Sequence, residues 1–178
     1  LFSARKPETF MLEDLGVALH GQSFRQRDVT DNLSASYPDP IDGYFNIGVL
    51  HTGMGGMGGH LNYAPCTLDD LVTKGYNYWA LGHVHHGVVL HQNPHVVFPG
   101  NLQGRHIREL GPKGAYLISV NDRDIIESGP LYTDVVRWAH LQVNVGGCDR
   151  HAEALERVRK AVEQAIDDGA DGRLLACR

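Results

Sequence analysis

An apolar, aromatic run that ends in a histidine-rich turn constrains this chain more than any other feature. Residues 76–81 (YNYWAL) are short, aromatic and bounded by glycine on both sides, which predicts a buried strand. Gly82 then allows the chain to turn, and His83, Val84 and His85 follow it. Because side chains two residues apart on an extended backbone point the same way, we expect both imidazoles to face one small volume while Val84 faces the core.

A second apolar run also ends in a histidine. Residues 46–50 lead into His51, and the glycine-rich segment 53–59 and His60 follow. In open α/β sheets the loops that leave the strands line a common crevice, so strand-end histidines are expected to gather there. Neutral imidazole suits manganese, iron and zinc alike, and His60 could swing toward such a site. The predicted metal ligands are His51, His83 and His85. Spacing alone equally allows an ordinary polar loop.

The rest of the chain combines many short strands with few helices. Strands are expected at residues 16–20, 45–50, 76–81, 87–91, 95–99, 114–120 and 124–127, and helices at 28–36 and 67–74. Thr67 and Asp70 form a capping-box pattern at the start of the second helix. The dense run of strands from residue 76 onward suggests the second sheet of a layered sandwich. The predicted fold class is therefore mixed, α/β (α+β).

The composition shifts near residue 130, which divides the chain into residues 1–130 and 131–178. The elements expected in the second part are a strand at 135–145, a helix from a capping Asp149 to Ile166, and a strand cut short at 173–178. The apolar stripe of this helix comprises Leu155, Val158, Val162, Ala165 and Ile166. Such a stripe favours a packing helix, and direct contact with DNA is the alternative.

Composition argues against several classes of protein. No run approaches the twenty apolar residues of a membrane span and no charged-then-apolar leader is present, so the cytoplasm is the expected location. The three cysteines are far apart and suggest neither a disulfide framework nor a zinc site. A net charge of −5 does not indicate a nucleic-acid surface. The local basic enrichment comprises Arg105, His106, Arg108 and Lys113, and it is also compatible with a solvated loop.

An ordered set of segments resembles the calcineurin-like metallophosphoesterases. The set comprises RKPETF at 5–10, LHGQSF at 19–24, LHT at 50–52, NYAPCTLDDL at 62–71, YNYWALGHVHH at 76–86 and VFPGNLQGRHIRELGPKGAYLISV at 97–120. A lone GHxH would be a weak signal, whereas the ordered set covers nearly the whole chain. Within the family, the chain is most similar to the bacterial DNA repair exonucleases of the SbcD type, especially their YhaO-like branch.

The resemblance implies a two-metal phosphodiesterase in which manganese is the usual activating ion. In such a site, His51 and His83 would bind one metal and His85 the other. Arg105 and His106 fall in a signature stretch beside the metals and are candidate lining residues. The resemblance further implies DNA as substrate and an SMC-like ATPase as partner, with no membrane association, and it leaves a homodimer open.

The first three metal motifs of the family, an Asp-x-His, a Gly-Asp-x-x-Asp and a Gly-Asn-His-Asp, are not found at strand ends in this sequence. The expected architecture is therefore the C-terminal half of a metallophosphoesterase sandwich in residues 1–130, followed by the start of a DNA-binding cap in residues 131–178. We interpret the chain as an internal segment of a longer enzyme. Without a bridging aspartate, the segment alone is expected to be catalytically incomplete.

Two other functions stay open at this point. One is a phosphodiesterase of the same fold that acts on small nucleotides, which would be expected to lack the cap segment at 135–178. The other is a non-catalytic module that docks on a partner protein. Cleavage of linear duplex DNA, compared with cleavage of a small phosphodiester, separates the two enzymatic functions.

Overall fold

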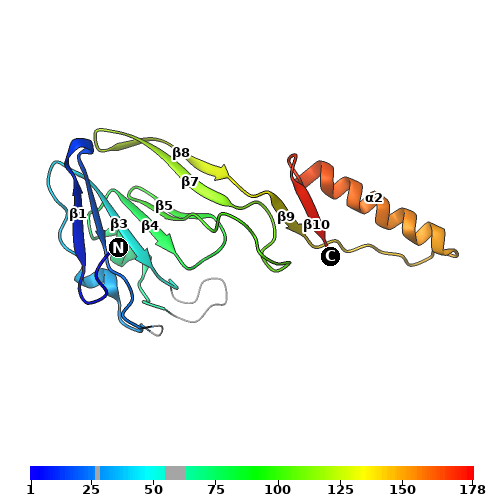
Figure 1. Cartoon of the computed structure of the whole chain (residues 1–178), viewed down its shortest axis with the longest axis horizontal. Helices are drawn as coiled ribbons and strands as arrows, with labels where there is room; N and C mark the ends of the chain where they lie inside the picture. Colours follow the sequence, from blue (N-terminus) through cyan, green and yellow to red (C-terminus); the bar gives the residue numbers. More distant parts are fainter. Residues whose placement is uncertain (27–28, 55–62) are drawn as a thin grey trace. The chain divides into compact units, whose positions relative to one another are not determined.

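The structure, a computed structural model, describes residues 1–26, 29–54 and 63–178 and divides into two compact units (Figure 1). The first unit comprises Leu1–Gly100 and Tyr116–Leu131, and the second comprises Asn101–Ala115 and Tyr132–Arg178. The fold class is mixed α/β, as predicted. The domain boundary expected at residue 130 stays a prediction. No helix in the described ranges is both long and apolar enough to cross a bilayer.

A six-stranded sheet organises the first unit. Its strands are β1 (Glu8–Leu12), β2 (Val17–Gly21), β3 (Phe45–His51), β4 (Tyr78–Gly82), β5 (Val88–Gln92) and β6 (His95–Phe98), and the 3-10 helix η1 (Glu13–Leu15) joins β1 to β2. The strand order is β1-β2-β3-β4-β6-β5, with four parallel inner strands and two antiparallel outer strands. The carboxyl ends of the inner strands therefore share one edge of the sheet, where a ligand crevice is expected.

A hairpin covers one face of this sheet. It is formed by β7 (Gly114–Asn121) and β8 (Asp124–Tyr132), which correspond to the strands predicted at 114–120 and 124–127. The apolar contact between the two layers comprises Phe45, Tyr78 and Val97 of the sheet and Tyr116, Ile118 and Ile125 of the hairpin. The expectation that a second sheet begins near residue 76 was wrong. The strands β4, β5 and β6 pair into the first sheet, whereas β7 and β8 form a separate two-stranded sheet.

Two short helices pack on the other face of the sheet. They are α1 (Leu68–Val72) and the 3-10 helix η2 (Leu33–Ser36). The predicted capping box of α1 is confirmed, because the Asp70 N–H donates to Thr67 Oγ1 at 3.1 Å and the Thr67 N–H donates to the Asp70 carboxylate at 2.8 Å. Of the helix expected at 28–36, the described residues form only η2.

Trp79 and Gly48 make a tight contact in the main core. Trp79 is fully buried, and its Nε1–H donates to the Leu71 carbonyl oxygen at 2.9 Å. Gly48 lies opposite Trp79 in the register of β3 and β4, and a Cβ built on Gly48 would lie 2.3 Å from the indole ring. The indole thus occupies the space that a side chain at position 48 would need.

We expect Gly48→Ala to destabilise the first unit by about 1–3 kcal/mol, because the added methyl group overpacks a core in which the indole of Trp79 is fixed by its hydrogen bond. Urea unfolding followed by tryptophan fluorescence measures the change. Gly129→Ala is the matched control, since nothing lies within 4 Å of a Cβ at Gly129. Equal losses of stability in the two variants would contradict this packing argument.

A buried imidazole ties β1 and β2 to β3. His20 is fully buried, with Nδ1 2.8 Å from Thr9 Oγ1 and Nε2 2.9 Å from Asn46 Oδ1. The Asn46 amide nitrogen donates to two backbone carbonyl oxygens, so its oxygen is the acceptor and His20 carries its proton on Nε2. Burial lowers the pKa of His20 from its usual 6.5; the hydrogen bond to Asn46 opposes this shift, and the charge on Lys74 adds to it.

The lowered pKa of His20 predicts a loss of stability in acid. As the pH falls below 6.5, the unfolded chain binds a proton at this histidine before the folded protein does. The free energy of unfolding should therefore fall between pH 6.5 and the lower folded pKa, with no contribution from this group above that window. His20→Gln cannot titrate, so its stability should drop less between about pH 7.5 and about pH 5.5 in urea unfolding. Parallel pH profiles of the two proteins would refute the assignment to His20.

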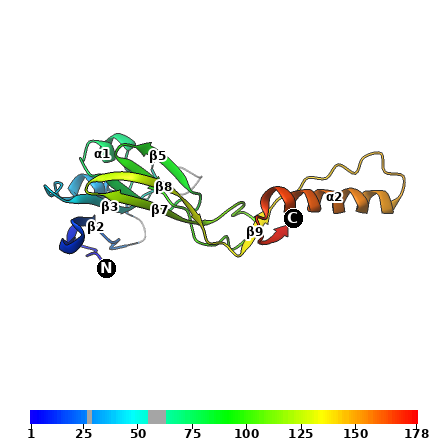
Figure 2. The ribbon, with the colours of Figure 1, turned by 90° about the horizontal axis from the view of Figure 1, so that it is seen from above.

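The second unit joins two parallel strands through one long helix. The strands β9 (Val136–Ala139) and β10 (Leu174–Cys177) pair in parallel, and α2 (His151–Gly169) lies between them in sequence, with its C-terminal end beside both strands (Figure 2). The strand predicted at the end of the chain is therefore confirmed. The predicted helix cap was wrong, because the N-cap residue is Arg150 rather than Asp149, without a side-chain cap bond.

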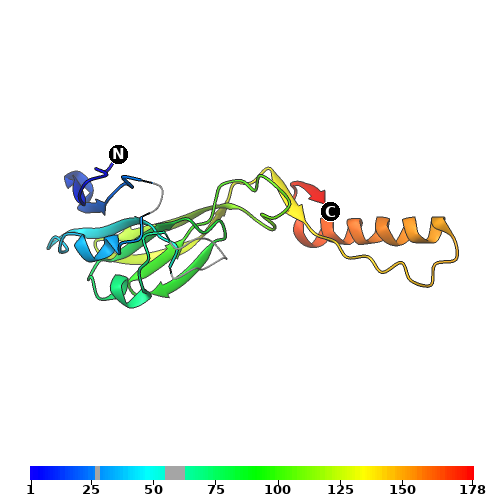
Figure 3. The ribbon, with the colours of Figure 1, turned by 90° about the horizontal axis from the view of Figure 1, so that it is seen from below.

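The strand expected at 135–145 ends early, at Ala139, because the chain then runs along α2 to its N-terminal end (Figure 3). The Arg157 guanidinium holds this segment by donating to the carbonyl oxygens of Asn144 and Gly146 at 2.9 and 3.0 Å. The helix buries none of its residues, and the predicted apolar stripe lies at the surface, with Leu155 63% exposed.

Asp134 is the centre of an ion network in the second unit. Its carboxylate is fully buried, with Oδ2 2.9 Å from Nε of Arg137 and Oδ1 2.9 Å from Nε of Arg173. Arg137 also donates to the Gly169 carbonyl oxygen at the end of α2, at 2.7 Å. Asp171 contacts both guanidinium groups from the surface. A single buried carboxylate thus connects β9, the end of α2 and the segment that leads into β10.

Candidate metal centre

The pairing of β3 with β4 brings His51 and His83 together. Strands β3 and β4 lie side by side in the sheet (Figure 1). His51 is the last residue of β3 and lies opposite Gly82, the last residue of β4, so the two strands place adjacent residues at the carboxyl edge of the sheet. Nε2 of His51 lies 3.2 Å from Nδ1 of His83, and the two ring centres are 5.1 Å apart. The convergence of these two predicted ligands follows from the parallel register.

The GHxH segment is not extended, contrary to the expectation that placed His83 and His85 on one strand face. The segment bends directly after β4, and His83 has a φ of +111°, in a region that L-residues rarely adopt. Val84 faces the core and is 9% exposed, as predicted, while His85 is exposed. A strained backbone at a polar side chain is typical of a functional position.

The surroundings of His51 favour its neutral form. Burial lowers the pKa of His51, and charge on His85 lowers it further, which places His85 within electrostatic reach of His51. A neutral imidazole has the lone pair that a metal ion requires. Gly82 gives His51 its room, because a Cβ at Gly82 would lie 3.1 Å from Nδ1 of His51. The absence of a side chain at Gly82 therefore leaves space for the His51 imidazole, a role that the sequence pattern did not predict.

A hollow of about 520 Å³ opens beside His51. Its described lining residues are Phe24, Arg25, Gln26, His51 and Tyr63. The ring centroids of Phe24 and His51 lie 5.4 Å apart with the ring planes at 82°, and those of Tyr63 and His83 lie 5.3 Å apart with the planes at 74°, so both pairs are edge-to-face. Sequence reasoning did not single out these aromatic residues; their only signal was their position in two of the segments that carry the family resemblance.

Two of the other predicted lining residues belong to the second unit. Arg105 and His106 are exposed residues of the second unit, where buried Glu109 accepts the Arg105 backbone N–H at 2.8 Å and lies 3.8 Å from Nε2 of His106. Lys113 is buried, and this burial lowers its pKa, so it does not belong to a solvated basic patch. Their role at the site stays a prediction. His60 lies outside the described residues.

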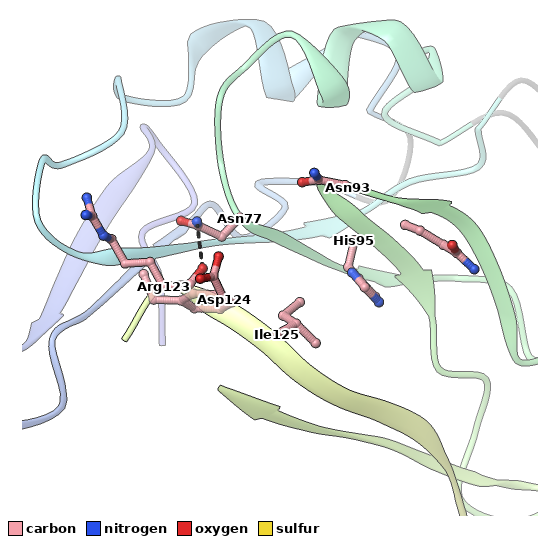
Figure 4. Close-up of a pocket in the computed structure, with 8 residues that line it drawn as sticks. Asn77, Asn93, His95, Arg123, Asp124 and Ile125 are labelled. Carbon is pink, nitrogen blue, oxygen red and sulfur yellow. Dashed lines mark hydrogen bonds between the residues drawn. The ribbon is translucent and has the colours of Figure 1, made fainter. Parts of the chain in front are cut away.

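A second hollow, of about 300 Å³, lies at the opposite, amino-terminal edge of β4 and β6 (Figure 4). Its polar groups connect the sheet to the hairpin: the Asn77 amide donates to the Arg123 carbonyl oxygen at 3.4 Å, and Nε2 of His95 lies 3.2 Å from Ser128 Oγ. The Arg123 side chain points away from His95 in this view. These groups support the fold, so the candidate site is the histidine edge.

Comparison with known proteins identifies the family. A family model described as the middle domain of the metallophosphoesterase YhaO matches residues 138–178. Over 149 residues the chain is 42% identical to the uncharacterized metallophosphoesterase YhaO of Bacillus subtilis (strain 168), an alignment that covers 82% of this chain and 36% of that relative. The chain belongs to the metallophosphoesterase family. It spans little more than a third of the length of this relative.

Metallophosphoesterases use divalent metals, and the histidine pair fits one such ion. Two nitrogen ligands about 2.0–2.1 Å from one ion, at octahedral or tetrahedral angles, lie about 2.8–3.4 Å apart. The 3.2 Å between His51 Nε2 and His83 Nδ1 falls in this range. In the described residues, however, no three His, Cys, Asp or Glu side chains cluster to hold a metal. The described chain thus offers two adjacent imidazoles at a separation that suits one divalent ion, with His85 within electrostatic reach of His51.

Proposed function

We propose that the protein to which this segment belongs is a metal-dependent phosphodiesterase that degrades DNA from its ends, an exonuclease of the SbcD type. The observation that carries the proposal is the 3.2 Å pair of imidazoles at the carboxyl edge of the sheet, beside a hollow that Arg25 lines. Family membership supports hydrolysis of a phosphate ester. The resemblance of residues 97–120 to repair exonucleases supports DNA as the substrate.

In this proposal each residue of the site has a defined task. His51 and His83 would hold one ion through their imidazole nitrogens, and His85 would contribute to a second. Two divalent ions, with Mn²⁺ the proposed activator, would supply a nucleophilic water at neutral pH and would neutralise charge on the phosphoryl oxygens. Arg25 attracts the phosphodiester to the edge of the sheet.

The 178-residue chain alone is expected to be essentially inactive. Imidazoles carry no charge, so they cannot neutralise or bridge two dications without carboxylate ligands, and the described residues contain no cluster of three such groups. We therefore place the missing carboxylates in the remainder of the full-length protein. An SMC-like ATPase is the proposed partner of that protein, and a homodimer is an additional arrangement to test.

The test is digestion of linear duplex DNA by the full-length protein in Mn²⁺, with bis-p-nitrophenyl phosphate as a small phosphodiester and EDTA as the control. The proposal predicts Mn²⁺-dependent release of nucleotides from duplex ends. Hydrolysis of the small ester without DNA cleavage would instead favour a small-nucleotide phosphodiesterase. Absence of both activities would favour a docking module. Turnover of DNA by the 178-residue chain itself would contradict the proposed need for further ligands.

A further inference from the structure

The strand order brings an aromatic residue and an arginine to the histidine edge from a distant part of the sequence. Because β2 lies beside β3, the chain that leaves β2 at Gly21 delivers Phe24 and Arg25 next to His51. Tyr63, which follows His51 in the sequence, lines the same hollow. These contacts all lie within the first unit.

The chemistry of this hollow suits a flat ring attached to an anion. Aromatic side chains stack on planar rings of any identity, and a guanidinium binds phosphate oxygens. None of the described lining residues is acidic, in a chain whose net charge is −5. The volume of about 520 Å³ lies within the usual range of about 300–1,000 Å³ for small-molecule sites.

We propose that Phe24 and Tyr63 form the binding pocket for the base of a nucleotide whose phosphate lies between Arg25 and the histidine pair. The inference rests on the proposed function, because it takes the substrate bound at His51 and His83 to be a phosphodiester.

The inference also assigns a specificity to the pocket. The pocket binds a base by stacking and does not select among bases, because every base presents a π-face. An abasic sugar phosphate would lose this contact.

Binding of dAMP and of 2-deoxyribose 5-phosphate to the 178-residue chain tests the pocket. The titrations are followed by chemical-shift changes in NMR spectra, with EDTA present so that no cleavage enters the measurement. We expect dAMP to bind about tenfold more tightly than the sugar phosphate, the effect of one stacked base. Phe24→Ala and Tyr63→Ala should each remove most of this preference while leaving affinity for the sugar phosphate unchanged. Tyr63→Phe keeps the ring and should retain it.

Two further variants separate the contributions of charge and of fold. Arg25→Gln should weaken both ligands, because both carry the phosphate that the guanidinium binds. Phe10→Ala is the matched control, since Phe10 is 45% exposed on β1 and does not line the hollow. Equal affinities for dAMP and the sugar phosphate, or equal losses in Phe24→Ala and Phe10→Ala, would overturn the pocket. Base-dependent binding without DNA cleavage by the full-length protein would overturn the proposed function alone.

Discussion

Replacing His83 with alanine in the full-length protein is expected to reduce Mn²⁺-dependent phosphodiester cleavage by more than about a hundredfold. The loss of a residue that only orients a ligand already costs about 10–100-fold, and His83 is proposed to be a ligand itself. The initial rate of DNA digestion at saturating Mn²⁺ measures the effect. His86→Ala is the control, because His86 is an exposed histidine of the same loop. Retained activity in His83→Ala would remove this histidine from the site.

His83→Gly separates activity from stability. The φ of +111° at His83 strains any residue that has a Cβ, and glycine relieves this strain. We expect His83→Gly to be inactive, like His83→Ala, but more stable than His83→Ala by about 1 kcal/mol. Urea unfolding of the two variants gives the comparison. A glycine variant less stable than the alanine variant would show that the backbone at this position is unstrained.

Removal of the Asp134 carboxylate is expected to destabilise the second unit by about 3–5 kcal/mol. Asp134→Ala leaves the guanidinium groups of Arg137 and Arg173 without their buried counter-charge, and uncompensated buried charge is strongly unfavourable. Urea unfolding gives the free energy, and amide hydrogen exchange in β9 and β10 shows whether the loss is confined to this unit.

The matched control for this change is Asp171→Ala. Asp171 contacts the same two arginines, but its side chain is 66% exposed, so water replaces the lost contacts. The expected loss for this surface ion pair is below about 1 kcal/mol. Equal free energies of unfolding for the two alanine variants would show that the buried position of Asp134 does not account for its contribution to stability.

The predictions that succeeded depend on local patterns. Apolar runs between glycines placed β3 and β4 to within one or two residues, and Thr67 with Asp70 specified the start of α1. Both are decided by residues that are close in sequence. The proximity of His51 and His83 was also predictable, because the residues that follow neighbouring parallel strands lie at the same edge of the sheet.

The features that were missed depend on long-range packing. Phe24 could be placed beside His51 only by knowing that β2 pairs with β3, and a strand order is not encoded in any local pattern. The prediction that the strand continues to residue 145 was wrong. Arg157, in α2, donates hydrogen bonds to the carbonyl oxygens of Asn144 and Gly146, so this segment packs along the helix instead of extending β9. The bend at His83 breaks the alternation expected of an extended chain, as functional positions often break local rules.

The central claim, that His51 and His83 are ligands of the same metal ion, can be tested on the 178-residue chain by NMR. Substoichiometric Mn²⁺ broadens the imidazole signals of the histidines nearest to it, even when the ion binds weakly, and histidine-to-alanine variants assign those signals. We expect the signals of His51 and His83 to broaden first, while those of His91, in β5, and of His140, an exposed residue of the second unit, remain sharp. Broadening of all histidine signals to the same extent, or sharp signals from His51 and His83 while other histidines broaden, would contradict it.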